Sequence, residues 1–453
     1  MRIMKLRLRS GISVLLILLF ALMLAVPAFA AVTVTPGDDF SVAAKAAILV
    51  ELNSDSVLYA QDADEKIYPA SLTKIMTCLL ALENGNLDDT VTVSATALEG
   101  LNPDGSSAEL QAGEQMTLRN LLYCVMLASA NDGCNVVAEY VSGSVEAFVE
   151  KMNERALEIG CTGTHFANPH GLHDDDHYTT ARDLARIAMV ALENDDFYTI
   201  CTTTSYTVPA TNLSDARTLY TTNYLTSDAM TPAYYWPTAR GVKTGYTSQA
   251  GRCLITTATG NGLSLLSVVC GAATVVQENG DLKLENFTES RRLLEFGLNN
   301  FDYATVLSNL DTIDQITVNF SAGADSVVVA PDSTITTILP KDYDENLLEK
   351  DVELDSPDGV DAPVSAGDKL GSVKVTYDGT ELGSADLVAI ADVPRSEFSY
   401  LRTQVKNFFL SYWYVLLLGL LGLLVLLYVL VYVSAQRRRK RRRAKARQER
   451  GQQ

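Results

Sequence analysis

Apolar residues are concentrated near both ends of this chain, and the long middle is mixed in character. Residues 12–26 form an apolar run behind four basic residues. Ala28-Phe29-Ala30 follows, with the small side chains that a signal peptidase requires. We therefore predict that residues 1–30 are a secretory signal peptide cleaved after Ala30. An uncleaved anchor helix is the weaker alternative, because the apolar run is short for a bilayer span.

The second apolar segment, residues 408–433, contains no charged residue and is long enough to cross a bilayer as one helix. Aromatic residues at both of its edges suit the two lipid–water interfaces. The arginine-rich residues 434–453 follow, and basic residues beside a span are typical of its cytoplasmic side. The pattern predicts a single-pass cell-membrane protein with a cytoplasmic C-terminal tail. Everything from the signal peptide to a linker over residues 396–407 then lies outside the cytoplasm.

The first part of the middle region alternates between strand and helix patterns. Residues 43–60 alternate as in a β-hairpin, and a β pattern returns over residues 252–270. Apolar positions at helical spacing predict helices between them and after them, over residues 69–82, 118–141, 145–159, 181–194 and 285–298. The arrangement predicts one α/β domain over residues 31–301, an antiparallel sheet flanked by helices and carrying a helical subdomain.

Residues 302–395 differ in character, because short β-patterned runs alternate there with turn residues. This pattern predicts a small all-β domain without chemistry of its own, acting as a spacer before the membrane. The runs cover residues 316–320, 327–329, 334–339, 373–377 and 382–390.

The net charge of −19 is unevenly distributed along the chain, because both ends are basic and the segment between them is therefore strongly acidic. Such a surface disfavours nucleic acid as a partner, and an anionic wall or membrane would not attract it. The seven cysteines match no zinc-ligand spacing. Several lie in apolar surroundings, which favours buried thiols over disulfides.

Candidate chemistry begins with Ser71-Leu-Thr-Lys74 in the predicted helix 69–82. Positions i and i+3 share a helix face, so the lysine amine can approach the serine hydroxyl. Free N–H groups in the first helical turn favour negative charge near Ser71. A chain of this length contains about one such pair by chance, so the motif needs support.

Two further motifs supply that support. Ser129-Ala130-Asn131 lies at a break between helical segments, and Lys243-Thr244-Gly245 begins a strand that resumes at Leu254. Taken alone, the first suits a helix cap and the second a plain turn. All three motifs in this order and at these separations are very unlikely by chance.

Together these motifs resemble the set shared by class A β-lactamases and penicillin-binding proteins. The surrounding segments, at residues 68–77, 129–144, 165–185 and 241–254, are similar to low-molecular-mass D-Ala-D-Ala carboxypeptidases. The resemblance spans residues 40–300. It implies a β-lactamase/transpeptidase-like fold, and the β domain and membrane-proximal end fit the same family.

The resemblance also implies roles for the first two motifs. Ser71 would attack the carbonyl between two D-alanines and become acylated, after a neutral Lys74 has taken its proton. Burial and the positive charge of Lys243 would lower the Lys74 pKa as this requires. Ser129 would pass the proton to the leaving nitrogen, and Asn131 would hold Lys74 and the substrate amide.

The third motif would bind the substrate. Lys243 and Thr244 would take the terminal carboxylate, and Gly245 would let the substrate backbone lie along the strand. The N–H groups of Ser71 and Tyr246 would form the oxyanion hole.

The chain departs from the family pattern at two places. Tyr246 stands where histidine is frequent, although only its N–H is needed. Residues 271–274 lack an arginine that binds the substrate carboxylate in some relatives, and Arg240 or Arg252 are candidates to replace it.

Several alternatives remain open at this stage. Histidines 165, 170, 173 and 177 with Asp174 to Asp176 could bind a metal, but the resemblance treats this segment as a structural loop, and we expect neither metal nor cofactor. A β-lactamase would need a Glu-x-x-x-Asn element before Lys-Thr-Gly, for which there is no convincing match. We therefore expect β-lactams to be covalent inhibitors.

A D,D-endopeptidase would use the same site, and an inactive wall-binding scaffold is the alternative of another class. The oligomeric state stays open.

Overall fold

The computed structural model describes residues 40–101, 105–229 and 231–450. The signal-peptide prediction for residues 1–30 lies outside these ranges. The chain divides into two compact units. Of the described residues, the first unit comprises those from 40 to 306 with 335–349 and 375–383, and the second comprises 307–334, 350–374 and 384–450.

A five-stranded antiparallel sheet forms the centre of the first unit, in the order β2-β1-β9-β8-β7. Its strands are β1 (Ala46–Glu51), β2 (Ser56–Gln61), β7 (Ala239–Thr247), β8 (Gly251–Gly260) and β9 (Leu263–Ala272). Two segments that are far apart in sequence thus lie side by side, because β1 pairs with β9. The hairpin predicted over residues 43–60 is confirmed as β1 and β2.

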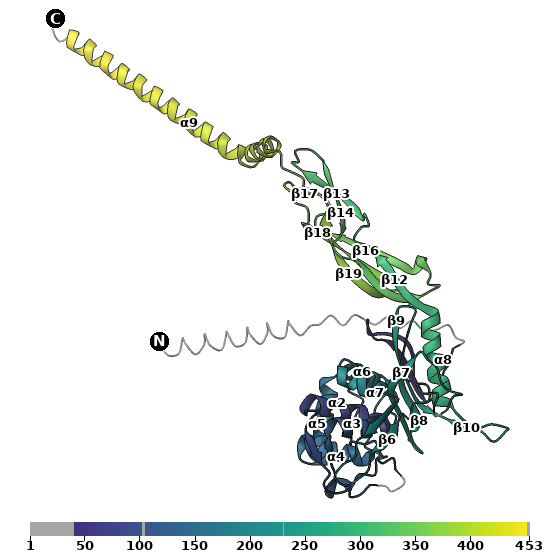
Figure 1. The fold of residues 1–453 in the computed structure, drawn as a ribbon. Helices are drawn as coiled ribbons and strands as arrows, with labels where there is room; N and C mark the ends of the chain where they lie inside the picture. Colours follow the sequence, from purple (N-terminus) through teal and green to yellow (C-terminus); the bar gives the residue numbers. More distant parts are fainter. Residues whose placement is uncertain (1–39, 102–104, 230, 451–453) are drawn as a thin grey trace, which may run out of the picture. The chain divides into compact units, whose positions relative to one another are not determined.

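The two faces of this sheet bury different sets of side chains. Ile48 and Val50 pack into the core shared with the helical subdomain, whereas Ala47 and Leu49 face the opposite way, toward α8 (Glu285–Asn300). This is the two-residue period of a strand buried on both sides. Figure 1 shows α8 on one side of the sheet and the helices α2 to α7 on the opposite side.

The helical subdomain contains most of the predicted helices. The helices of this subdomain are η1 (Ala70–Thr73), α2 (Lys74–Asn84), η2 (Thr96–Leu98), α3 (Leu118–Met126), α4 (Asn131–Ser142), α5 (Val145–Glu158), α6 (Ala181–Leu192) and α7 (Asp195–Thr202), of which η2 and α7 were not predicted. Thr117, Ser144 and Thr180 cap helices α3, α5 and α6 by accepting a backbone N–H bond. The first unit also contains three two-stranded antiparallel sheets: β3 (Thr90–Thr92) with β4 (Gln115–Thr117), β5 (Ser205–Val208) with β6 (Arg217–Tyr220), and β10 (Thr274–Val276) with β11 (Leu282–Leu284).

Three local predictions need correction. The helix predicted over 69–82 begins as a 3₁₀ turn, so Ser71 precedes the α-helix that starts at Lys74. The helical pattern over 118–141 is broken between α3 and α4, where Ser129 has a φ of 58° that an α-helix cannot accommodate. Residues 243–245 do not begin a strand that resumes at Leu254. They lie inside β7 and pair with β8, the neighbouring strand.

The C-terminal region is built from strands, as predicted. β12 (Phe301–Leu307) pairs with β15 (Ile335–Pro340), and a six-stranded sheet has the order β16-β18-β19-β14-β13-β17. Its strands are β13 (Asp314–Asn319), β14 (Ser326–Pro331), β16 (Leu348–Leu354), β17 (Val360–Asp361), β18 (Lys369–Tyr377) and β19 (Thr380–Ala389), and η3 (Glu345–Leu347) precedes β16. β16 escaped prediction because most of its side chains are exposed and polar, which leaves no apolar alternation to detect.

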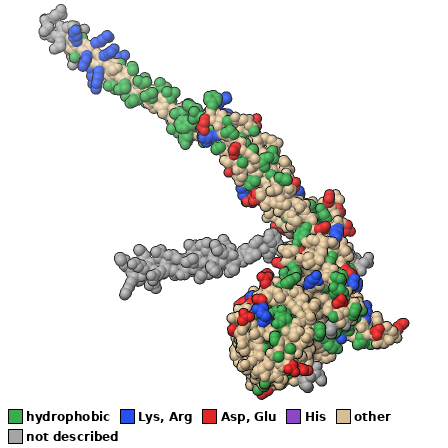
Figure 2. Space-filling view, in the orientation of Figure 1, with side chains coloured by type: hydrophobic (Ala, Val, Ile, Leu, Met, Phe, Trp, Pro, Cys, Tyr) green, Lys and Arg blue, Asp and Glu red, His purple; other side chains and the backbone are tan. Residues whose placement is uncertain are grey.

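One helix, α9 (Glu397–Arg450), covers the predicted linker from residue 397, the whole predicted span and the predicted tail as far as residue 450. It is the one helix in the described ranges that is long and apolar enough to cross a membrane. Figure 2 shows hydrophobic side chains along α9 followed by a basic stretch toward its end. The boundaries proposed within it at residues 408, 433 and 434 stay predictions.

Candidate active site

The three motifs meet in one cleft of about 1100 Å³ in the first unit. Ser71 comes from η1, Ser129 from the turn before α4, Asn131 from the first position of α4, and Thr244, Gly245 and Tyr246 from β7. These six residues all line the cleft. Lys74 and Lys243 do not line it but are buried, at 0% and 2% exposed. The structure thus brings together all eight residues singled out in the sequence, with the two amines beneath the surface.

Lys74 is the centre of the hydrogen-bond network. Its Nζ lies 2.9 Å from Ser71 Oγ, 2.8 Å from Asn131 Oδ1 and 2.6 Å from the carbonyl oxygen of His170. Burial lowers the pKa of Lys74 from its usual 10.5 to about 8. A neutral Lys74 can accept the Ser71 proton while its two remaining N–H groups stay bonded to the two carbonyl-type oxygens.

Lys243 lies on β7, and its Nζ donates to the carbonyl oxygen of Thr244 at 3.1 Å. Burial, and then the positive charge of Lys74, lower the Lys243 pKa to about 7. The Thr244 hydroxyl is 2.5 Å from that of Thr222, which also lines the cleft. A carboxylate bound near Thr244 would favour the charged form of Lys243 and so raise its pKa.

Asp132, next to Asn131, was not identified as a site residue from the sequence. Its carboxylate accepts bonds from the Ala108 and Leu110 N–H groups, both at 3.1 Å, and from Ser107 Oγ at 2.7 Å. It thereby braces the segment that carries Ser106, whose carbonyl accepts the Asn131 N–H at 2.8 Å. An acidic residue in the first turn of α4 was the available signal.

Two glycines allow the segments around Ser71 to approach closely. A Cβ on Gly171 would lie 1.8 Å from the carbonyl oxygen of Ala70, and the φ of Gly171 is +86°. A Cβ on Gly245 would lie 3.0 Å from the Pro69 oxygen and 3.1 Å from the Ser71 nitrogen. Glycine at position 245 is therefore required for packing as well as for substrate access, since β7 passes directly against the Ser71 turn.

The histidine-containing loop, residues 165–177, packs against Lys74. His177 Nδ1 accepts the Ala167 N–H at 2.9 Å, so Nε2 carries the proton and donates to Thr73 Oγ1 at 2.7 Å. Burial lowers the pKa of His177 to about 4 and that of His170 to about 3. His170 contributes its main-chain oxygen to Lys74, a function that no sequence motif indicates because every residue has a carbonyl.

The two departures from the family pattern lie near each other. The Tyr246 side chain is 57% exposed, and the Arg252 guanidinium lies 4.6 Å from its ring centroid. Arg252 lines the cleft, and its Nε donates to Thr274 Oγ1 at 2.7 Å. Arg240 instead donates to the carbonyls of Pro237 and Ala239 and is not among the cleft-lining residues described. Arg252 is thus the better placed of the two candidate arginines.

The seven cysteines all lie in the described part of the chain, and each is a buried free thiol, as the sequence favoured.

Comparison with known proteins agrees with this geometry. Residues 31–274 match the family described as D-alanyl-D-alanine carboxypeptidase, and residues 301–395 match the C-terminal domain of penicillin-binding protein 5. The chain belongs to the D-alanyl-D-alanine carboxypeptidase family. It is therefore a hydrolase of the transpeptidase-like fold, followed by an all-β domain.

Named relatives within this family cover most of the chain. D-alanyl-D-alanine carboxypeptidase DacF of Bacillus subtilis is 30% identical over 85% of this chain and 95% of its own length. DacC of Escherichia coli is 31% identical, over 79% and 86%. The crystal structure of penicillin-binding protein 5 from Haemophilus influenzae has 30% identity and a TM-score of 0.57, covering 79% of this chain and 99% of that one.

Proposed function

We propose that this chain removes the terminal D-alanine from peptidoglycan stem peptides ending in D-Ala-D-Ala, through an acyl-enzyme on Ser71. The observation that carries the proposal is the 2.9 Å separation of Lys74 Nζ from Ser71 Oγ at the edge of the cleft. A nucleophilic serine requires a base within hydrogen-bond reach. The carboxypeptidase names of the relatives support the substrate class.

In the acylation step, neutral Lys74 takes the Ser71 proton and Ser71 Oγ attacks the carbonyl carbon between the two D-alanines. The N–H groups of Ser71 and Tyr246 stabilise the negative charge on the carbonyl oxygen. Ser129 passes the proton to the nitrogen of the terminal D-alanine, and the carbon–nitrogen bond breaks. Water then hydrolyses the ester and restores Ser71.

The substrate carboxylate couples the two lysines. It binds at Thr244, with Lys243 supplying positive charge from beneath and Arg252 as a further cationic group in the cleft. Stabilising the Lys243 cation disfavours a second positive charge on Lys74, so substrate binding prepares the base. The absence of a side chain on Gly245 leaves room for the peptide along β7.

We further propose that β-lactams acylate Ser71 and stay bound, because no Glu-x-x-x-Asn element, which activates water in class A β-lactamases, precedes Lys243-Thr244-Gly245 in the sequence. The enzyme would be exported by residues 1–30, held by α9 with the basic tail in the cytoplasm, and act in peptidoglycan maturation and cell shape. Metal content measured after dialysis tests the expectation that the histidine loop holds no ion.

Full-length protein in detergent, given a peptide ending in D-Ala-D-Ala, should release free D-alanine and accept fluorescent penicillin. S71A should abolish both, whereas S333A, at an exposed position in the β domain, should behave as the parent. Continued release by S71A would remove Ser71 from its role. A parent protein that neither releases D-alanine nor accepts penicillin would be the inactive scaffold.

A further inference from the structure

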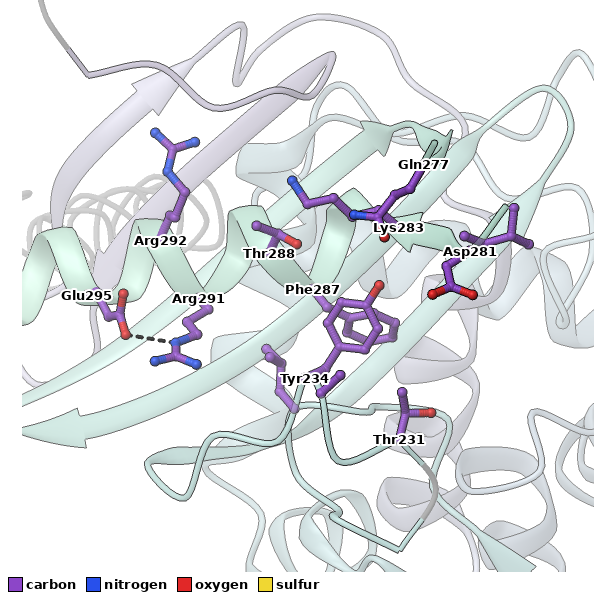
Figure 3. A pocket seen from close by; sticks show the side chains of 13 residues that line it. Thr231, Tyr234, Gln277, Asp281, Lys283, Phe287, Thr288, Arg291, Arg292 and Glu295 are labelled. Carbon is purple, nitrogen blue, oxygen red and sulfur yellow. Dashed lines mark hydrogen bonds and ion pairs between the residues drawn. The ribbon is translucent and has the colours of Figure 1, made fainter. Parts of the chain in front are cut away.

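A second cavity of about 670 Å³ opens beside the cleft that contains Ser71 (Figure 3). The two cavities share four lining residues, namely Thr231, Tyr234, Leu282 and Phe287. The second cavity is also lined by charged side chains of both signs. Each of its cations already has a carboxylate partner: Arg291 with Glu295, Arg292 with Glu289 and Lys283 with Glu285. The second cavity is thus largely neutralised by its own ion pairs.

The cleft itself has a different charge distribution. The chain has 55 acidic residues against 36 basic ones, yet no aspartate or glutamate is among the described residues that line the cleft. Arg252 is the one side chain among them with a permanent charge. Its Nε donates to Thr274 Oγ1, and no described residue accepts a hydrogen bond from its two terminal nitrogens. A carboxylate that enters the cleft therefore meets an available guanidinium, whereas an ammonium group meets no counter-ion.

Asn286 lies at the same end of the cleft as Arg252. Leu284, two residues before it, pairs with Thr274, whose hydroxyl accepts the bond from Arg252. Asn286 lines the cleft, is 2% exposed, and its Oδ1 has no hydrogen-bond partner among the described residues. Native structures seldom keep a buried polar group unpaired without a function for it. Rotation about the terminal torsion can present either the oxygen or the nitrogen of this amide to a ligand.

The first turn of α8 adds a further attraction for negative charge. Leu284, at the N-cap position, makes no side-chain cap bond, and the N–H groups of Asn286 and Phe287 have no acceptor in the described ranges. Such N–H groups and the helix dipole favour an anion. Glu285, the acidic residue of this turn, is paired with Lys283 and does not line the cleft. The guanidinium, the amide and the helix terminus thus all offer donors at one end of the cleft.

The proposed substrate path leads past this end. The terminal carboxylate binds at Thr244 and the scissile carbonyl at the Tyr246 N–H, so the peptide follows β7 in the direction of increasing residue number. Arg252 is the register partner of Tyr246 on β8, and its guanidinium lies 4.6 Å from the Tyr246 ring centroid. The residue before the two D-alanines, which is a diamino acid in peptidoglycan stem peptides, lies beyond Tyr246. Its long side chain can therefore reach Arg252 and Asn286.

We propose that Arg252, Asn286 and the first turn of α8 bind a carboxylate on the side chain of this diamino acid. The inference rests on the proposed function and names the kind of stem peptide that the site prefers. A diamino acid whose side chain ends in an amino group and a carboxylate on one carbon supplies the anion. Lysine ends in an ammonium group alone, which would face Arg252 without a counter-ion. At longer range, the same guanidinium adds positive charge for the terminal carboxylate at Thr244.

Two tripeptides that differ by one carboxylate test the inference with full-length protein in detergent. One is Nα-acetyl-Lys-D-Ala-D-Ala, and the other carries meso-diaminopimelate in place of lysine. We expect kcat/KM for D-alanine release to be about tenfold or more higher for the diaminopimelate peptide. Amidation of the side-chain carboxylate should bring the value to within about twofold of that for the lysine peptide.

Variants of Asn286 assign the preference to this end of the cleft. Asn286→Leu removes the amide at similar volume and should reduce the preference to about threefold or less. Asn286→Asp keeps the shape, adds a negative charge, and should shift the preference toward the lysine peptide. Ser290→Ala is the matched control, because Ser290 is also buried on α8 with an unpartnered Oγ but lines neither cavity. It should keep the preference of the parent, and penicillin labelling checks that each variant is folded.

Three results would overturn the inference while leaving the proposed function intact. They are a parent protein that hydrolyses both tripeptides equally or prefers lysine, an Asn286→Leu variant that slows both by the same factor, and a Ser290→Ala variant that loses the preference to the same extent. A parent protein that releases D-alanine from neither tripeptide and is unlabelled by penicillin would overturn the proposed function itself.

Discussion

At the scale of single residues, the site depends on two lysines held out of water. Taking an ammonium group into a low-dielectric interior disfavours its charged form, and this is the larger cause of the lowered pKa at both Lys74 and Lys243. The lowered pKa makes Lys74 available as a base near neutral pH, where an ordinary lysine with a pKa of 10.5 would stay protonated.

The rate of Ser71 acylation should therefore rise with pH. Lys74 acts in its neutral form, whose fraction grows as pH passes about 8, so the rate should climb between pH 6 and 9 and then level off. The measurement is the first-order rate of labelling by fluorescent penicillin at saturation. A profile without change across this interval would argue against Lys74 as the base.

Lys74→Arg is the matched variant for this prediction, because a guanidinium keeps its charge but cannot lose its proton in this range. It should lose about a thousandfold or more in acylation rate and should not recover at high pH. Recovery at pH 9 would show that another group takes the proton.

At the scale of elements, the active site forms where a loop and a strand press against the turn before α2. Gly171 from the histidine-containing loop and Gly245 from β7 both approach the residues around Ser71 so closely that a Cβ would collide or nearly so. The position of the nucleophile is thus set by three segments that are far apart in sequence.

Gly171→Ala should displace the Ser71 turn. The added Cβ would meet the Ala70 oxygen at 1.8 Å, and the φ of +86° is already unfavourable for alanine. We expect a loss of about 2 kcal/mol or more in the free energy of unfolding. Because the displaced turn carries Ser71, the rate of penicillin acylation should fall about tenfold or more.

Gly143→Ala separates the two causes. Gly143 has a similar φ of +79°, but no atom lies within 4 Å of its added Cβ. This variant should lose only about 1 kcal/mol and should keep its acylation rate. Equal losses of acylation in both variants would show that backbone strain, and not the contact with Ala70, is responsible. Chemical denaturation and gel labelling provide both measurements.

At the scale of the whole molecule, an acidic chain carries one apolar helix with a basic end. Since the acidic portion has no electrostatic attraction to an anionic bilayer, the apolar segment of α9 is the expected source of membrane attachment. This makes attachment separable from catalysis.

Removal of residues 397–453 should release the protein in soluble form with unchanged D-alanine release from a soluble peptide. A chain ending at Val433 keeps the apolar segment and should remain in the membrane pellet after alkaline extraction. Fractionation followed by penicillin labelling checks both. A pellet-bound 1–396 chain would show that another surface attaches it.

Features that are encoded within short segments could be predicted from the amino-acid sequence. The uncharged run over 408–433, the alternation in β1 and β2, and the three motifs at Ser71, Ser129 and Lys243 could all be identified without coordinates. Each depends on side-chain type and spacing within a short segment. The membership of the motifs in one site followed from their order and from the family resemblance.

The way in which those segments meet could be seen only in the folded protein. It revealed the bond from Lys74 to the His170 carbonyl, the burial of Lys243 beneath Thr244, the contact that requires Gly171, and the second cavity beside the cleft. Main-chain oxygens are the same in every residue, and burial and cavities arise from segments distant along the chain. A local sequence pattern predicts neither of them, so these features could be identified only in the folded protein.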